Sequence, residues 1–152
     1  MYLDERLEFC DATVVTGMGG ATTLIGDVID LGSVARDIGQ GQPMYWVVQV
    51  AVVITGGTSN RWILASDSAE AINTGGTASQ HVLTDVYAVA DLVAGFQVIF
   101  PLPMGDVAAS VSPYEQYLGV LNVDVGTETA GSINSFLTAD PHGWRAYPDA
   151  NN

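Results

Sequence analysis

Apolar side chains recur at every second position in several parts of the chain, which is the pattern typical of β-strands. The strongest run covers residues 44–55, where one face is apolar throughout and the other is interrupted only by Gln49. A strand that is apolar on both faces is expected in the middle of a sheet or beneath an interface. Residues 44–55 are therefore predicted to form a central strand.

Two further runs flank a proline-rich corner. The run before the corner has one apolar face, formed by Phe96, Val98, Phe100 and Leu102. The run after it has apolar residues at 121, 123 and 125, opposite Asn122 and Asp124. Because proline cannot donate to a sheet ladder, Pro101 and Pro103 should end the first strand or place it at a sheet edge. The segment predicts a strand, a stiff corner and a returning strand.

Shorter strands are predicted at 21–31, 61–66, 80–90 and 132–138, with glycine-rich turns between them. Residues 69–72 suit a single helical turn capped by Asp67 or Ser68. The fold expected is an all-β antiparallel β-sandwich, jelly-roll-like, with an extended N-terminal arm. It forms one domain over residues 1–152, in which 1–11 is the arm and 140–152 is a C-terminal tail.

The charge balance narrows the range of partners. Seventeen acidic residues stand against four arginines and no lysine, which gives a net charge of −13. Such a chain is repelled by nucleic-acid phosphates and by anionic membranes, so we expect neither as a partner. Partners with basic patches are favoured instead.

Catalytic and metal-binding patterns are sparse. Cys10 is the sole cysteine, so neither an internal disulfide nor a cysteine metal cluster is expected. His81 and His142 lack ligand spacing, and the glycines at 17–20 have no lysine with which to form a phosphate loop. We therefore expect no enzyme activity, no metal and no cofactor. The N-terminus does not resemble a signal peptide and no apolar run is long enough to span a membrane, so a soluble, cytosol-made protein is expected.

Four passages in order along the chain carry a family resemblance. They are LEFCDAT, DVIDLGSVARDIGQGQPMYWVVQV, the corner VIFPLPMG followed by YEQYLGV, and AGSINSFLTADP. Together they resemble the capsid cement (decoration) proteins of tailed bacteriophages, of the small jelly-roll type known from a short-tailed Bordetella phage. The likeness covers roughly Leu3 to Pro141.

This resemblance implies a structural protein of the virion, on the outer capsid surface and made in the host cytoplasm. It implies that the chain forms a homo-oligomer, with a homodimer favoured over a trimer, and that it bridges neighbouring subunits of the major capsid protein. One alternative is a carbohydrate-binding jelly-roll module on a virion or cell surface, with Trp62, Trp144 or Tyr45 as the sugar platform. Another is a catalytic sandwich that uses paired acids.

Within the cement hypothesis, the contacts are assigned to the corner, the arm and the tail. Prolines and tyrosines suit an interface because little entropy is lost on ordering them. The predicted contact residues are Tyr2, Leu3, Leu7, Leu102, Pro103, Met104, Tyr114, Tyr117, Trp144 and Tyr147. For Leu102 and Tyr117 a place in the core is an equal alternative. The corner assignment predicts that Leu102→Asp with Tyr114→Asp leaves the isolated protein folded and abolishes shell binding.

Overall fold

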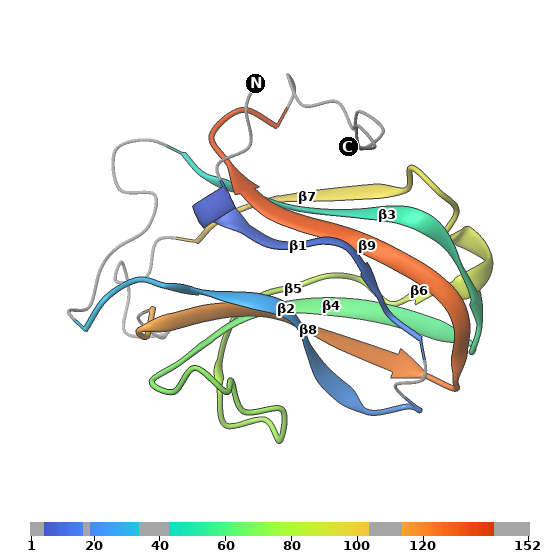
Figure 1. The fold of residues 1–152 in the computed structure, drawn as a ribbon, viewed down its shortest axis with the longest axis horizontal. Helices are drawn as coiled ribbons and strands as arrows, with labels where there is room; N and C mark the ends of the chain where they lie inside the picture. Colours follow the sequence, from blue (N-terminus) through green and yellow to red (C-terminus); the bar gives the residue numbers. More distant parts are fainter. Residues whose placement is uncertain (1–4, 17–18, 34–42, 104–113, 142–152) are drawn as a thin grey trace.

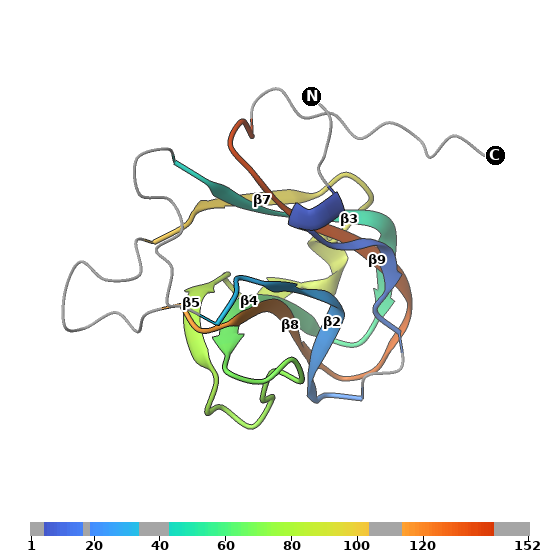
Figure 2. The same cartoon turned by 60° about the vertical axis from the view of Figure 1, so that its left-hand side comes forward.

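Two antiparallel sheets face each other in the computed structural model, which describes residues 5–16, 19–33, 43–103 and 114–141 (Figures 1 and 2). Two short 3-10 helices are present in these residues, η1 (Glu5–Leu7) and η2 (Val89–Asp91). The strands are β1 (Glu8–Val14), β2 (Thr22–Asp30), β3 (Tyr45–Gly56), β4 (Ser59–Asp67), β5 (Ser79–Leu83), β6 (Tyr87–Ala88), β7 (Gln97–Pro101), β8 (Tyr117–Val125) and β9 (Glu128–Thr138).

The strand order is that of a jelly roll. One sheet runs β1-β9-β3-β7 and the other β2-β8-β4-β5, with the short β6 pairing with one end of β4. Along the chain, β1 passes to β2, β3 to β4, and β7 to β8, so the polypeptide repeatedly crosses from one sheet to the other. This arrangement confirms the predicted antiparallel sandwich of jelly-roll type.

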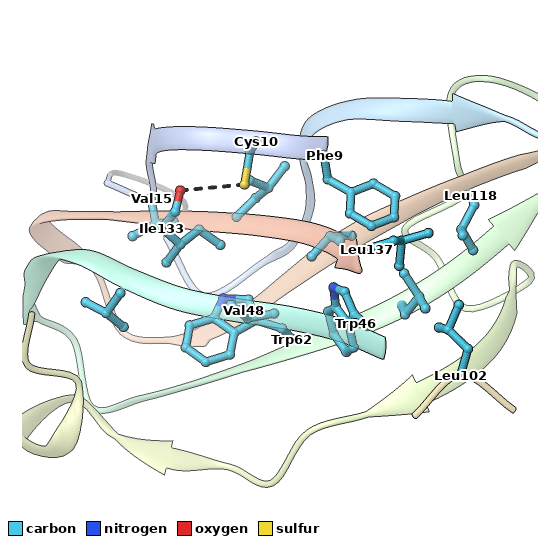
Figure 3. Packing of buried hydrophobic residues seen from close by; sticks show 14 of the residues in the cluster. Phe9, Cys10, Val15, Trp46, Val48, Trp62, Leu102, Leu118, Ile133 and Leu137 are labelled. Atoms are coloured by element: carbon cyan, nitrogen blue, oxygen red, sulfur yellow. Dashed lines mark hydrogen bonds between the residues drawn. The ribbon is translucent and has the colours of Figure 1, made fainter. Parts of the chain in front are cut away.

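The core fills the space between the sheets (Figure 3). Alternation along β3 points Trp46, Val48 and Val50 inward, where they belong to the same buried cluster as Trp62 and Leu64 of β4. β3 is hydrogen-bonded to β7 on one side and to β9 on the other. It is therefore the central strand that its apolar pattern predicted.

A second, smaller cluster covers the outer face of the β2-β8-β4-β5 sheet. Ile72, from the connection between β4 and β5, packs there with Ile63 and Leu121. A Cβ atom at Gly119 would lie 2.6 Å from Ile72 Cδ1, so the glycine lets this side chain pack closely against β8. Both faces of this sheet are thus packed against other parts of the chain.

The orientation of β8 follows from these two clusters. Leu118 and Val120 belong to the main core, and alternation places Asn122 and Asp124 on the same inner face. Leu121 and Val123 face the outer cluster instead. Asn122 and Asp124 are almost completely buried. The predicted division of β8 into an apolar and a polar face is confirmed, and the face carrying the two polar residues is the inner one.

Three local expectations differ from the structure. The strand predicted at 80–90 is divided into β5, β6 and η2. The arm predicted at 1–11 is shorter, because residues 8–11 already belong to β1, which pairs with β9. Residues 69–72 do not form a helical turn, and 69–71 are bends. The carboxylate of Asp67 still binds this segment, since it accepts hydrogen bonds from the amides of Ala69 (3.4 Å) and Asn73 (3.0 Å).

Candidate functional site

The described ends of the proline-rich corner are anchored in the core. Leu102 is 8 % exposed and Tyr114 is 2 % exposed, and both belong to the main buried cluster. The Tyr114 hydroxyl donates a hydrogen bond to the Pro103 carbonyl at 2.8 Å, which joins the two ends of the corner. The structure thus places Leu102 in the core, which is the alternative to its predicted contact role, and it also buries Tyr114, which was predicted as a contact residue beyond the corner.

The other predicted contact residues are placed as follows. Leu7, Pro103 and Tyr117 are half-buried, and Leu7 packs against the main core. Their assignment to an interface stays a prediction. The remaining five lie outside the described residues: Tyr2, Leu3, Met104, Trp144 and Tyr147.

Next to the corner, Ser66, His81, Tyr114 and Glu115 form a set of polar contacts that we call the corner cluster. Ser66 Oγ lies 2.7 Å from His81 Nε2 and accepts a hydrogen bond from the Glu115 amide at 2.9 Å. The imidazole of His81 stacks on the Tyr114 ring, with 4.0 Å between ring centroids. Ser79, on β5, adds a hydrogen bond of 2.8 Å from its hydroxyl to Glu115 Oε1. The cluster joins β4 and β5 to the returning end of the corner.

The corner cluster keeps its histidine neutral. Burial lowers the pKa of His81 to about 4, because the charged imidazolium loses its hydration there. Burial likewise raises the pKa of the Tyr114 hydroxyl well above its ordinary value. Although Ser66 and His81 are within hydrogen-bonding distance, Ser66 is fully buried and no substrate can reach its hydroxyl. The cluster is therefore a structural element of the corner.

At the opposite end of β4, three more polar side chains are buried between the sheets. Asn60, Asp124 and Glu128 are each at most 2 % exposed. The Asn60 amide donates to Glu128 Oε1 at 3.3 Å, and the Gly20 amide donates to Asp124 Oδ2 at 2.9 Å. We call Asp124 and Glu128 the turn-end pair, because they flank the β8–β9 turn.

The turn-end pair holds two carboxyl groups in contact. Burial and the neighbouring Asp124 carboxyl raise the pKa of Glu128 above its ordinary value, since a second negative charge is unfavourable there. Both carboxyl groups are buried too deeply to act on a sugar, so the pair does not supply the paired acids of a catalytic sandwich.

The sugar-platform alternative loses one of its residues. Trp62 is fully buried in the core, where its ring lies 6.2 Å from that of Tyr87. Its assignment as a sugar platform is wrong. Tyr45 is half-buried at the start of β3, and Trp144 lies outside the described residues.

An uncharged groove opens beside β1, β3 and β9. It has a volume of about 470 Å³, and Ala12, Val14, Val52 and Ala130 are among the residues that line it. No charged side chain lines it, although the chain carries a net charge of −13. Val14 is 59 % exposed and Val52 is 52 % exposed, so the groove presents apolar surface to solvent.

A β-bulge shapes one wall of this groove. Ala12 has a φ of +44°, a left-handed conformation that is uncommon for any residue with a side chain. The bulge lies where the β1–β9 register shifts between Cys10 and Thr13, and the Ala12 amide donates to Asn134 Oδ1 at 2.6 Å. Such bulges re-aim neighbouring side chains. Val14 follows this bulge and is turned to solvent.

Reactive or metal-binding groups are scarce in the described residues. The Cys10 thiol is buried and donates to the Ile133 carbonyl at 3.6 Å (Figure 3). Burial raises the pKa of Cys10 to about 12, so it stays a thiol at neutral pH. The described part of the chain contains no group of three or more His, Cys, Asp or Glu side chains arranged for a metal, and no helix that could cross a membrane.

Comparison with known protein families shows to which family the chain belongs. The family model Bbp16 matches residues 9–137, which include all nine strands apart from their outermost residues. The chain belongs to the Bbp16 family. The family takes its name from a Bordetella phage protein, and this confirms the resemblance predicted from the four sequence passages. A comparison with curated proteins finds no match.

Membership of the Bbp16 family indicates a phage protein that is a component of the virion. The match begins at the start of β1 and ends at the end of β9, so it covers the jelly roll of this chain. The uncharged groove and both buried polar clusters lie within the matched residues.

Sequence reasoning missed both buried clusters. Ser66 and His81 are separated by 15 residues, and Gly20 and Asp124 by 104 residues, so only the fold brings them together. A weak signal was present in β8, where Asn122 and Asp124 interrupt an otherwise apolar strand. Polar residues in a strand that is packed on both faces must have buried partners.

Proposed function

We propose that this Bbp16-family protein binds the outer surface of a phage capsid as a homo-oligomer and cements neighbouring major capsid protein subunits. The observation that carries the proposal is the family match over residues 9–137. It supports a structural role in the virion, and the proposed role involves neither catalysis nor a cofactor.

The charge of the chain favours the outside of the particle. With seventeen acidic residues against four arginines, it is repelled by packaged nucleic acid. A protein outside the shell is separated from the genome and can bind basic surface of the shell subunits at its acidic positions. Weak contacts made by several subunits of an oligomer add through avidity.

The uncharged groove is the contact surface that we assign to the major capsid protein. Val14 and Val52 are both more than half exposed in a wall without ionisable groups. Fully burying an exposed valine side chain contributes roughly 1.5–3 kcal/mol, and since about half of each of these two valines is already buried, covering both adds about as much as one full valine. Desolvating this groove costs little because no charge loses its hydration there.

Replacing both valines with aspartate tests this assignment. We expect Val14→Asp with Val52→Asp to leave the melting temperature of the isolated protein within a few degrees of wild type, because both positions are exposed. The double variant should no longer co-sediment with shells that lack the protein, and it should not raise the melting temperature of those shells.

The matched control carries the same two added charges elsewhere. Val86 is 61 % exposed and Val93 is 53 % exposed, and neither lines the groove. Val86→Asp with Val93→Asp should therefore decorate shells as the wild type does. Full decoration by the groove variant would contradict the groove assignment. Failure of the wild-type protein to bind shells, together with binding of glycans by the free protein, would favour the carbohydrate-binding alternative.

A further inference from the structure

The turn-end pair buries two acidic groups beside one amide. Glu128 is 1 % exposed and Asp124 is 2 % exposed. Asn60 pairs with Asp124 across β4 and β8 and donates to Glu128 Oε1 at 3.3 Å, so both acidic side chains lie next to Asn60. Two ionised carboxylates placed in this way would repel strongly in a buried site, where water does not screen them. One of the two must therefore be neutral for the site to be stable as it is folded.

The hydrogen bonds of the pair show how this occurs. Glu128 Oε1 and Asp124 Oδ2 each have a donor, from Asn60 and from the Gly20 amide. Glu128 Oε2 and Asp124 Oδ1, like Asn60 Oδ1, are buried without a hydrogen-bond donor among the described residues. Leaving two buried oxygens unsatisfied is costly, and a carboxyl proton turns one oxygen of the pair into a donor for the other carboxylate.

The groups that surround the turn-end pair are consistent with one proton bound between Asp124 and Glu128. Asp124 of β8 is the charged side chain that acts on Glu128, while β4 contributes the neutral Asn60. The β3–β4 turn contributes Gly57, and the segment before β2 contributes only the Gly20 amide. Arg61 is next to Asn60 in β4 and lies on the other face of the strand, so it does not neutralise the pair.

We propose that Asp124 and Glu128 hold a single shared proton, and that this proton stabilises the end of the sandwich at the β8–β9 turn until it is released to water. The inference does not depend on the proposed function, because it concerns the folded chain alone. With the proton bound, the pair carries one negative charge and one carboxyl–carboxylate hydrogen bond. After its release, two adjacent carboxylates remain and this end of the sandwich loosens.

The turn-end pair lies where three connections of the chain contact one another: the segment before β2, the β3–β4 turn and the β8–β9 turn. The Gly20 amide joins the segment before β2 to Asp124, and Glu128 opens β9 directly after the β8–β9 turn. The β3–β4 turn is fixed against both, since Thr58 N donates to Val125 O at 2.7 Å and a Cβ at Gly126 would lie 2.8 Å from Gly57 Cα. Repulsion within the pair therefore acts on all three connections.

A bound cation is the competing explanation for two buried carboxylates. Calcium takes six to eight oxygen ligands, while the turn-end pair with Asn60 offers at most five side-chain oxygens, and the described residues contain no group of three acidic or histidine side chains around it. A proton needs only the two carboxyl oxygens that lack donors. The observations therefore favour the proton, and the test includes the cation.

Glu128→Gln is the decisive variant. The glutamine amide donates a permanent hydrogen bond to Asp124, so it replaces the protonated carboxyl without changing shape. In the wild type, side-chain carboxyl NMR should show that Glu128 titrates above the ordinary glutamate range. Measured relative to Glu128→Gln, the wild-type melting temperature should fall between pH 5.5 and pH 8.5, because the contribution of His81 is common to both proteins.

Two variants and a metal addition complete the experiment. Glu128→Gln should lose the shifted titration and should melt at a higher temperature than wild type at pH 8.5. Glu70→Gln, at an exposed position, is the control and should keep the wild-type pH dependence. The proposal is overturned if every wild-type carboxyl titrates in its ordinary range. It is also overturned if calcium at pH 8.5 raises the melting temperature of the wild type but not of Glu128→Gln.

Discussion

A buried polar cluster lies at each end of β4. The histidine of one cluster is neutral because it has lost a proton, and the glutamate of the other is neutral because it has kept one. At one end Ser66 contacts His81 in the corner cluster, and at the other Asn60 contacts Glu128 of the turn-end pair. The clusters therefore lie at opposite ends of the sandwich (Figure 1). Burial removes a proton from the histidine and retains one on the glutamate, because in each case the charged form loses its hydration.

This difference gives the two clusters opposite effects on stability. The folded-state pKa of His81 lies below its ordinary value, so its stabilising contribution is present above about pH 6.5 and is lost as the pH falls toward 4. The folded-state pKa of Glu128 is raised, so its contribution is present below about pH 4.5 and is lost as the pH rises through about 7. Between these limits the two contributions change in opposite directions, which flattens the pH dependence of the whole protein.

The largest expected loss of stability comes from placing charges in the core beneath the proline-rich corner. Leu102→Asp with Tyr114→Asp places two carboxylates in the core, and the cost exceeds the roughly 5–15 kcal/mol by which domains are stable. We expect no cooperative thermal transition in circular dichroism. The sequence-based expectation that this double variant stays folded is therefore reversed by the burial of both residues.

Tyr114→Phe is the control for that experiment. It removes only the hydroxyl that donates to the Pro103 carbonyl and keeps the ring against His81, so it should cost about 1 kcal/mol. A double aspartate variant that melts like the wild type would show that the corner is not anchored in the core.

The next largest effect is the contribution of His81 to the pH dependence of stability. His81→Gln keeps a hydrogen-bonding group beside Ser66 and removes the titration. The wild type should lose roughly 3 kcal/mol more than this variant between pH 6.5 and pH 4, given the linkage between a pKa shift and the free energy of unfolding. Urea denaturation at a series of pH values measures the difference.

The opposite behaviour is expected for Glu128→Gln, whose stability should rise with pH from 4.5 to 6.5 because only the contribution of His81 remains. Wild type and both variants measured in the same buffers sharpen the comparison between the two ends. Parallel pH curves for His81→Gln and Glu128→Gln would contradict the assignment of opposite roles.

The smallest effect separates buried from half-exposed contacts within the corner cluster. Ser66→Ala removes a fully buried hydroxyl that contacts both the Glu115 amide and His81 Nε2, and it should cost about 1–3 kcal/mol of unfolding free energy. Ser79→Ala removes a partly buried hydrogen bond to Glu115 Oε1 that water can replace, so its cost should stay below about 1 kcal/mol. Equal costs in chemical denaturation would show that burial does not distinguish the two serines.

Much of the sandwich was predictable from local sequence. The alternation in residues 44–55 predicted a central strand, and β3 is paired on both sides. The runs on either side of the corner became β7 and β8, and Pro101 lies at the end of β7, an edge strand, as its missing amide proton requires. These features depend on backbone geometry and on which residues alternate, and both can be read along a single strand.

The candidate site was less predictable because it depends on segments distant in sequence. The groove needs the β1 bulge at Ala12 beside Val52 of β3 and Ala130 of β9. Whether Leu102 and Tyr114 face solvent or the core depends on where the corner folds back. Alternation alone cannot answer this, since an apolar face suits a core and an interface equally well.

The sequence by itself determined that this chain is a β-sandwich and that it is strongly acidic, with four arginines and no lysine. The four sequence passages determined the family. Only the tertiary structure decided which face of β8 is buried between the sheets. Leu121 and Val123 are covered by the connection between β4 and β5, so the inner face is the one that carries Asn122 and Asp124. The physical reason is that a period of two defines two faces of a strand, while the packing of other elements decides what each face contacts.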